Sequence, residues 1–248
     1  MKFIPMERKD NRQNSQLRPL SVQFGFQQHP VGSVLIGFGQ TRVLCSVSVE
    51  MSVPRWMKEQ NKQGGWITAE YQMLPGATAQ RSEREVSRGK LSGRSAEIQR
   101  LVGRSLRAVV DLTKLPGMTL HVDCDVIDAD GGTRCAAITG AALALECAAR
   151  NLLQQGILQE SPLKERVAAV SVGMLAGQAL LDLCYEEDSA AAVDMNVVMT
   201  ASGQFVELQG SGEEATFSEV ELEQLLTVAK SGLREIFAFG DKVLGAAG

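Results

Sequence analysis

Hydrophobic and polar residues alternate along three segments near the start of the chain, which is the period of a β-strand with one buried face. Turns containing glycine or proline separate these segments, so the pattern predicts strands at residues 20–26, 31–38 and 42–50. The polar stretch 51–65 predicts a loop, and the residues that follow predict a strand at 66–71. The first 16 residues are polar and charged, and we expect them to form a loosely held, flexible segment.

The remaining chain alternates helical and extended periods, which is typical of an α/β or α+β protein. Apolar spacing predicts helices at 94–112, 133–155 and 218–238. Period-two segments predict a strand at 118–127, a hairpin of 167–172 and 178–183, and a second hairpin of 194–200 and 204–209. Both halves share this outline and no low-complexity segment separates them, so we expect one domain over residues 17–248 with internal pseudo-duplication.

Length and composition are those of an ordinary globular protein. With 248 residues and 44% hydrophobic content, the chain can bury one large core or the cores of two small lobes. No apolar run reaches the roughly 18 residues that a membrane span requires, so we expect no membrane partner. The opening residues lack the extended apolar region of a secretory signal, which predicts a cytoplasmic protein.

Cysteine and histidine usage argues against several kinds of catalysis. The five cysteines are odd in number and form no Cys-x-x-Cys pair, so we expect reduced core residues and no zinc site. His29 precedes a proline in a turn and His121 lies in a predicted strand, which are structural or surface positions. A histidine-activated serine or cysteine nucleophile is therefore not expected. Catalysis would depend on carboxylates, a metal or a nucleophile supplied by a substrate.

The segment Asp128-Ala-Asp-Gly-Gly-Thr-Arg134 closes a predicted strand and opens a predicted helix. Its glycines allow the backbone to approach an anion closely, while the Thr133 hydroxyl, the Arg134 guanidinium and the first N–H groups of the helix can bind one phosphate. The spaced glycine and Lys-Ser/Thr pair of a P-loop are absent. The same residues also suit an ordinary turn with Thr133 as a helix cap, so this segment alone leaves both interpretations open.

A cluster of basic residues lies just upstream. Residues 81–107 contain eight basic and three acidic residues, a net charge of +5, whereas the whole chain carries −4 and its remainder therefore −9. This concentration is typical of a surface that binds a polyanion. The alternative is a solvated helix face, because Arg100, Arg104 and Arg107 recur at helical spacing. We expect both: an amphipathic helix at its C-terminal part, and an approach loop from Arg81 to Arg94.

The acidic segment that follows Tyr185 is a candidate metal site. Asp194 and Asn196 share one side of a predicted strand, and the six-residue interval puts Asp188 on the same side if the segment is extended. Paired carboxylates at strand ends can hold a divalent ion such as Mg²⁺, which also binds substrate phosphate oxygens. The alternative is an acidic turn whose carboxylates are solvated.

Five motifs, in order along most of the chain, resemble those of the ribonuclease PH family. They extend the candidate segments above, and several long motifs in the right order make the resemblance specific. The motifs are Trp66-Ile-Thr-Ala-Glu-Tyr71, Arg88-Gly-Lys-x-Ser-Gly-Arg94-Ser-x-Glu-Ile-Gln-Arg-Leu101, Asp123-Cys-Asp-Val-Ile-x-Ala-Asp-Gly-Gly-Thr-Arg134, Val170-Ser-Val-Gly173 and Glu187-Asp-Ser-Ala-Ala-x-x-Asp-Met-Asn-Val-Val198.

The resemblance implies a phosphorolytic 3′-to-5′ exoribonuclease, or tRNA nucleotidyltransferase, that trims precursor tRNA and acts on rRNA. It implies an α+β fold similar to a duplicated second domain of ribosomal protein S5, and a homohexameric ring of dimers. By matching motif positions, the co-substrate inorganic phosphate would be bound by Arg94, Gly132, Thr133 and Arg134. Asp188 and Asp194 would bind Mg²⁺ and act in catalysis, and Arg81 and Arg84 would contact the RNA.

The chain departs from the family at Gly76, where an arginine is usual, so one RNA-facing cation is missing. This departure bears on RNA binding and leaves the phosphate motif intact. Two rival functions remain: a metal-dependent hydrolytic nuclease, which would use the same carboxylates with water, and a catalytically silent ring subunit that only binds RNA. Silent subunits tend to lose the phosphate and acidic motifs, and this chain keeps both.

Overall fold

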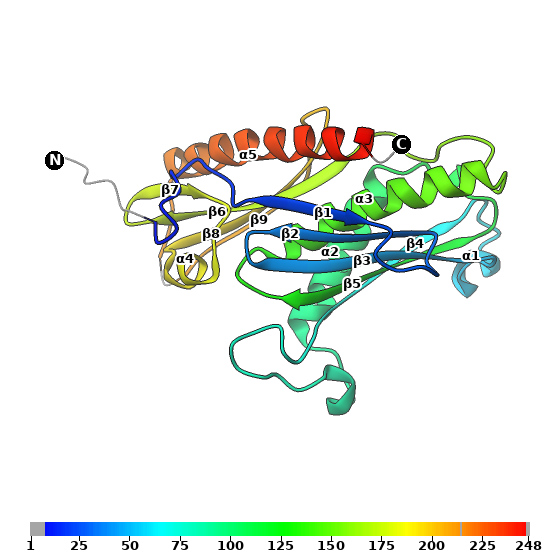
Figure 1. The fold of residues 1–248 in the computed structure, drawn as a ribbon, viewed down its shortest axis with the longest axis horizontal. Coiled ribbons are helices and arrows are strands. Elements are labelled where there is room, and N and C mark those ends of the chain that lie inside the picture. Colours follow the sequence, from blue (N-terminus) through cyan, green and yellow to red (C-terminus); the bar gives the residue numbers. More distant parts are fainter. Residues whose placement is uncertain (1–7, 214, 247–248) are drawn as a thin grey trace.

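The computed structural model describes residues 8–213 and 215–246, which form two β-sheets with helices packed on them (Figure 1). The first sheet has the strand order β1-β2-β3-β5-β4. Its adjacent strands are antiparallel, except for β4 and β5, which are parallel. The second has the order β7-β6-β8-β9 and is antiparallel. The strands are β1 (Leu20–Phe24), β2 (Gly32–Phe38), β3 (Thr41–Glu50), β4 (Trp66–Met73), β5 (Thr119–Asp128), β6 (Val167–Leu175), β7 (Gln178–Leu181), β8 (Val193–Thr200) and β9 (Phe205–Gly212).

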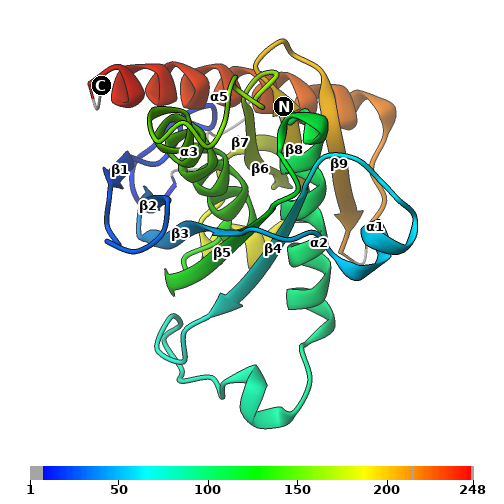
Figure 2. The same cartoon turned by 90° about the vertical axis from the view of Figure 1, so that its right-hand side faces the viewer.

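Three long helices complete the layers: α2 (Gly93–Ala108), α3 (Thr133–Gln154) and α5 (Glu219–Ala246). α3 packs against β2, β3 and β5 of the first sheet and against β6 of the second, so both sheets share it. α2 packs on β4, and α5 lies along the second sheet (Figures 1 and 2). Because α3 and α5 both contact β6, the strand is buried from Val167 to Met174 and forms a continuous run of small and apolar residues.

Small residues allow α3 to lie between the sheets. Six of its alanines are buried, and a Cβ added at Gly140 would lie 2.7 Å from the side chains of Ile36 and Cys45. Among the described residues, α3 is the one helix whose length and apolar composition would suit a membrane span. About two thirds of its apolar window is buried, which is the placement of a core helix.

The hydrophobic core is continuous across the two sheets, with buried side chains from β2, β3, α3, β6, β8 and α5 in one cluster. Cys45, Cys124 and Cys135 are buried in it, while Cys147 and Cys184 are partly exposed, and all five thiols are free. His29 and the His121 side chain are exposed, as expected of surface residues.

The predicted strands and long helices are all present, but α2 ends at Ala108, before the predicted residue 112, and α5 continues to Ala246, past the predicted residue 238. Other differences fall in short or polar segments. The loop predicted at 51–65 contains a helix, α1 (Arg55–Glu59), which begins after Pro54 and buries Met57. A segment of five residues is too short for a helical period to be recognised in the sequence. The approach loop also contains a 3₁₀ turn at Glu85–Arg88.

The acidic segment is not extended, and the prediction that placed Asp188 beside Asp194 along one strand is wrong. β7 ends at Leu181, Asp182 turns the chain with φ 54°, and Asp188 lies on a short helix, α4 (Tyr185–Ala190). Contacts between elements, not strand parity, determine how the two carboxylates meet.

Two arginines of the polar N-terminal segment are buried, which its composition does not predict. Arg8 and Arg12 are 2% and 8% exposed, and their guanidinium groups pair with Glu187 and Asp182. The acidic partners of these arginines come from a distant part of the chain, so composition could not predict that the two side chains are buried. The flexibility of segment 1–16 stays a prediction. Residues 1–7 lie outside the described part.

Candidate functional site

The turn between β5 and α3 can be built only with glycine at two positions. Gly131 and Gly132 have φ values of 71° and 63°, in the left-handed region that favours glycine. A Cβ at Gly131 would lie 2.5 Å from the carbonyl oxygen of Leu183, and one at Gly132 would lie 2.9 Å from Nη2 of Arg18. The turn is therefore packed tightly against the segment that leads into α4.

α3 begins directly after this turn and presents two predicted phosphate ligands. Oγ1 of Thr133 lies 2.8 Å from the hydroxyl of buried Tyr71 on β4. Arg134 donates from Nη1 to Oε1 of Gln209 on β9, at 2.5 Å, and lies 3.7 Å from a carboxylate oxygen of Glu97. Its side chain is 16% exposed, so the guanidinium is held in place before any ligand arrives. The positive end of the helix dipole adds to its charge.

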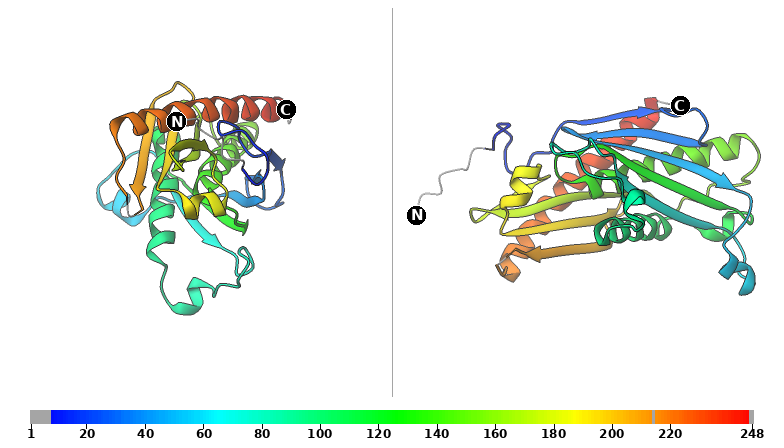
Figure 3. Two further views of the ribbon diagram at one scale, coloured as in Figure 1. Left: turned by 90° about the vertical axis from the view of Figure 1, so that its left-hand side faces the viewer. Right: turned by 90° about the horizontal axis from the view of Figure 1, so that it is seen from below.

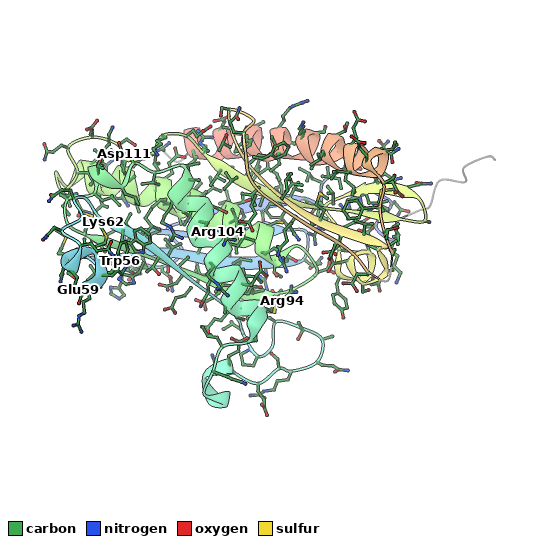
Figure 4. All side chains as sticks on the ribbon, turned by 180° about the vertical axis from the view of Figure 1, so that it is seen from behind. Trp56, Glu59, Lys62, Arg94, Arg104 and Asp111 are labelled. Atoms are coloured by element: carbon green, nitrogen blue, oxygen red, sulfur yellow. The ribbon has the colours of Figure 1, made fainter. Side chains whose placement is uncertain are left out.

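Arg94 lies at the start of α2, where the Ser92 side chain caps the helix by accepting a hydrogen bond from the backbone of Ser95. The residue is exposed and makes no hydrogen bond or ion pair with another described residue. Figure 4 shows it at the end of the helix next to the loop that descends from β4, whereas Arg104 lies further along the same helix. Arg94 is therefore available to an anion.

The acidic pair lies close to these arginines. Burial raises the pKa of Asp188, and the nearby Asp194 carboxylate raises it further. Three guanidinium groups oppose that rise in the pKa, those of Arg94, Arg134 and Arg18. Four charged groups from separate positions of the sequence thus act on the carboxyl group of Asp188.

Sheet register explains why Arg134 and Asp194 converge. Asn196 on β8 is directly opposite Gln209 on β9, so their side chains share one face of the sheet. Gln209 holds Arg134, and Asn196 accepts a hydrogen bond from the Cys135 thiol at 3.1 Å. Asp194 precedes Asn196 by two residues on the same face, about 6.6 Å along the strand. The first turn of α3 therefore lies over this part of the second sheet.

The basic residues of segment 81–107 divide, as expected, between a helix and the loop before it. Arg104 forms a bidentate pair with Glu207 on β9, and Arg107 lies over the ring of Trp66 and donates to the carbonyl of Ile67. Both belong to the structured helix. Arg81 and Arg84, in contrast, are exposed on the loop between β4 and α2, which protrudes from the body (Figure 2), and their side chains have no partner among the described residues.

The loop also contains Gly76, where the family usually has arginine. A Cβ at this position would meet no atom within 4 Å, and its φ is not in the left-handed region. Packing therefore does not require glycine here.

Sequence analysis missed a cluster of buried charges that supports the site. Arg18 donates from Nε and Nη2 to the two carboxylate oxygens of Asp182, at 3.0 and 2.6 Å, and both side chains are nearly inaccessible. The same guanidinium donates to the carbonyls of Asp130 and Gly131, in the turn before α3. Figure 3 shows the N-terminal segment beside α4 and the second sheet. This cluster ties the turn to the segment that carries Asp188.

Glu187 is the second acid of that cluster. Arg8 donates to both of its carboxylate oxygens, at 2.7 and 2.6 Å. Burial opposes its ionisation, but hydrogen bonds from Arg8 and from the backbone of Cys184 outweigh burial and lower its pKa. Tyr71, Arg8, Arg18, Asp182 and Glu187 were missed, although Tyr71 and Glu187 stand within the motifs quoted for the resemblance.

Two family models match successive parts of the chain. Residues 16–150 match the first domain of the 3′ exoribonuclease family, and residues 165–232 match its second domain. A search of solved structures finds rice (Oryza sativa) Rrp46 with a TM-score of 0.76 and 22% identity, over 96% of this chain and 100% of that one. The expected α+β fold, like domain 2 of ribosomal protein S5, is confirmed. Together with the arginine and carboxylate site, these matches define a 3′ exoribonuclease.

Curated relatives narrow the family further. Ribonuclease PH of Bacillus velezensis is 56% identical over 96% of this chain and 97% of the relative, and ribonuclease PH of Bacillus subtilis has the same identity and coverage. Ribonuclease PH of Corynebacterium efficiens is 54% identical over 96% of each. The chain belongs to the ribonuclease PH family, and it is a phosphate-dependent nucleotidyltransferase that processes tRNA from the 3′ end.

Proposed function

We propose that the chain performs phosphorolysis of RNA 3′ ends at one site, where Arg94, Gly132, Thr133 and Arg134 hold the attacking phosphate. The observation that carries this assignment is the charge around Asp188: two arginines from different helices and a second carboxylate all act on it. Such a site can bind one anion on the arginines and direct it toward a second beside the carboxylates.

The reaction needs no activated side-chain nucleophile. A phosphate oxygen attacks the phosphorus of the last internucleotide linkage, and the bond to the 3′ oxygen of the preceding nucleotide breaks. The terminal nucleotide leaves as a nucleoside diphosphate, and the shortened RNA keeps the 3′ oxygen, which takes up a proton. Two unit negative charges at 4 Å repel by about 4 kcal/mol at an effective dielectric constant near 20. Arg94 and Arg134 offset this repulsion and align the phosphate.

The acidic pair suits a divalent cation. The Asp194 carboxylate raises the pKa of Asp188, so the two carboxylates repel each other, and a cation between them would relieve that repulsion. Asp194 also accepts a hydrogen bond from Ser211 at 3.1 Å, which orients it. Mg²⁺ commonly binds through one or two carboxylates together with substrate phosphates. We assign Asp188 and Asp194 to Mg²⁺; when bound, the ion supplies positive charge to the transferring phosphoryl group.

One assay tests the reaction against its rivals. The protein is incubated with a 3′-extended tRNA, Mg²⁺ and labelled inorganic phosphate, with EDTA in a parallel sample. We expect label in nucleoside diphosphates, and loss of product with EDTA. Unlabelled nucleoside monophosphates would identify a hydrolytic nuclease, and RNA binding without any product would identify a silent subunit.

Arg81 and Arg84 are proposed to contact RNA phosphates. Replacing either by alanine should weaken RNA binding and reduce the slope of log K against log salt by about 0.7–0.9 for each lost phosphate contact. Gly76→Arg should change the slope in the opposite direction, since nothing obstructs a side chain there. Arg55→Ala, on α1 and already paired with Glu59, is the control. Binding titrations at several salt concentrations measure these slopes. A slope for Arg81→Ala equal to that of the control would show that Arg81 does not contact an RNA phosphate.

The remaining family properties are proposals as well. The chain is expected to assemble as a hexameric ring of dimers. Light scattering on the purified protein distinguishes six subunits from two. We expect the enzyme to act in the cytoplasm, on rRNA as well as tRNA ends.

A further inference from the structure

A cleft of about 1350 Å³ lies beside the phosphate turn and has not been assigned a role above. Its lining comes from the N-terminal segment, the turn, the loop after β4 and the start of α4; residues used below are Arg18, Arg81, Asp130 and Tyr185. The cleft thus adjoins the proposed active site without containing Arg94 or Arg134.

Tyr185 is the unusual residue of this cleft. Its 64% exposure is high for a large aromatic side chain, and of the exposed large apolar residues in the described chain it is the one that lines the cleft. Its backbone is fixed, because the N–H donates to Oδ1 of Asp130 at 3.1 Å and the Gly131 turn packs against the same peptide. A ring presented to solvent from a rigid backbone is suited to contact a ligand.

The charges around the cleft indicate what that ligand is. Lys9 pairs with Glu186, and Arg18 with Asp182. The four carboxylates of the lining are engaged as well: Asp10 by Arg12, Glu186 by Lys9, Glu187 by Arg8, and Asp130 by the backbone N–H of Tyr185. Arg81 is the cation in the lining that has no described partner. One free cation and one exposed aromatic ring form the combination by which proteins hold single-stranded nucleic acid: the cation neutralises the backbone and the ring stacks on a base.

Helix geometry sets where on the RNA this contact falls. Tyr185 and Asp188 are three residues apart on α4, so their Cβ atoms are about 5–6 Å apart on one face. A stacked strand advances about 3.4 Å per nucleotide. A base on the Tyr185 ring would therefore lie within one or two nucleotides of the phosphate at the acidic pair.

We propose that Tyr185 is a stacking platform for the terminal or penultimate base of the RNA substrate. This inference rests on the proposed function of the adjoining site. Stacking does not read hydrogen-bonding edges, so it accepts any base, as an enzyme that removes successive nucleotides requires. Tyr185 would hold the RNA end against the acids while phosphate attacks.

Binding of oligoribonucleotides, measured by fluorescence anisotropy in the absence of phosphate, tests the platform independently of catalysis. Tyr185→Ala should raise the RNA Kd about 5- to 150-fold, the range equivalent to ~1–3 kcal/mol for one stacked base. Tyr185→Phe should stay within about twofold, because the ring and not the hydroxyl makes the contact. Phe26→Ala, an exposed aromatic outside the cleft, is the matched control and should leave Kd unchanged.

Oligonucleotides with one abasic position locate the contact. An abasic terminal or penultimate nucleotide should weaken binding to the unaltered protein but cause no further loss with Tyr185→Ala. Two results would overturn the stacking contact. One is that the abasic nucleotide, at either position, weakens RNA binding by Tyr185→Ala as much as it weakens binding by the unaltered protein. The other is that Tyr185→Phe binds RNA as weakly as Tyr185→Ala. The KM for phosphate should not change in Tyr185→Ala. A failure of phosphorolysis itself would appear in the labelled-phosphate assay of the unaltered protein, and is thereby distinguished from a failure of stacking.

Discussion

Replacing Arg134 by alanine is expected to raise the KM for phosphate about tenfold to a hundredfold or more. A charge-assisted hydrogen bond contributes about 1.5–3 kcal/mol, and each 1.4 kcal/mol corresponds to a factor of ten. Gln209 and Glu97 already hold the guanidinium, so little further side-chain entropy is lost when phosphate binds. Steady-state rates at varied phosphate concentrations measure the change.

Arg94→Ala should also raise the KM for phosphate, but by a smaller factor than Arg134→Ala. Its side chain has no described partner, and ordering a free arginine on the ligand costs up to about 2 kcal/mol of side-chain entropy. Arg134→Lys should recover only part of the affinity, because a lysine offers a point charge without the planar fork. Arg150→Ala, at the far end of the same helix, is the control. A normal phosphate KM in both Arg134→Ala and Arg94→Ala would refute the phosphate site.

Local sequence was sufficient for the parts of the fold that have a clear period. The strands alternate because one face is buried, and the turn before α3 was singled out because Gly131, Gly132, Thr133 and Arg134 are contiguous. The junction of β5 and α3 gives those residues their geometry without help from the rest of the chain. Candidate residues confined to one turn can thus be recognised from sequence.

The supporting residues could not be found in this way, because their roles depend on contacts between distant segments. Arg18 and Asp182 are 164 positions apart, and Tyr71 meets Thr133 across 62 positions. Asp188 and Asp194 were proposed together for a reason that proved wrong, since one lies on a helix and the other on a strand. An arginine in a polar N-terminal segment is expected to be solvated, and only its acidic partner shows that it is buried.

Arg18→Ala is expected to cause the largest loss of stability among these variants. Removing one partner of a buried ion pair costs about 3–5 kcal/mol, because the remaining Asp182 carboxylate is left buried with only the guanidinium of Arg12, 3.9 Å away, as counter-charge. For a protein of this size that loss corresponds to a fall in Tm of roughly 6–20 °C. Thermal unfolding followed by circular dichroism measures it. Arg104→Ala breaks a bidentate pair whose arginine is half exposed, and should cost less than about 1 kcal/mol.

The same variant separates a stabilising role from a positioning one. Phosphate stabilises a folded protein that binds it by RT ln(1 + [L]/Kd), so its addition should raise the Tm of the unaltered chain and of Arg104→Ala. In Arg18→Ala the carbonyl of Asp130 loses its guanidinium donor and that of Gly131 keeps only the hydroxyl of Thr41, so the turn is held less firmly. We therefore expect a much smaller Tm increase with phosphate, and a raised phosphate KM at temperatures where the variant is fully folded. An undiminished response to phosphate would show that Arg18 stabilises the fold without positioning the turn.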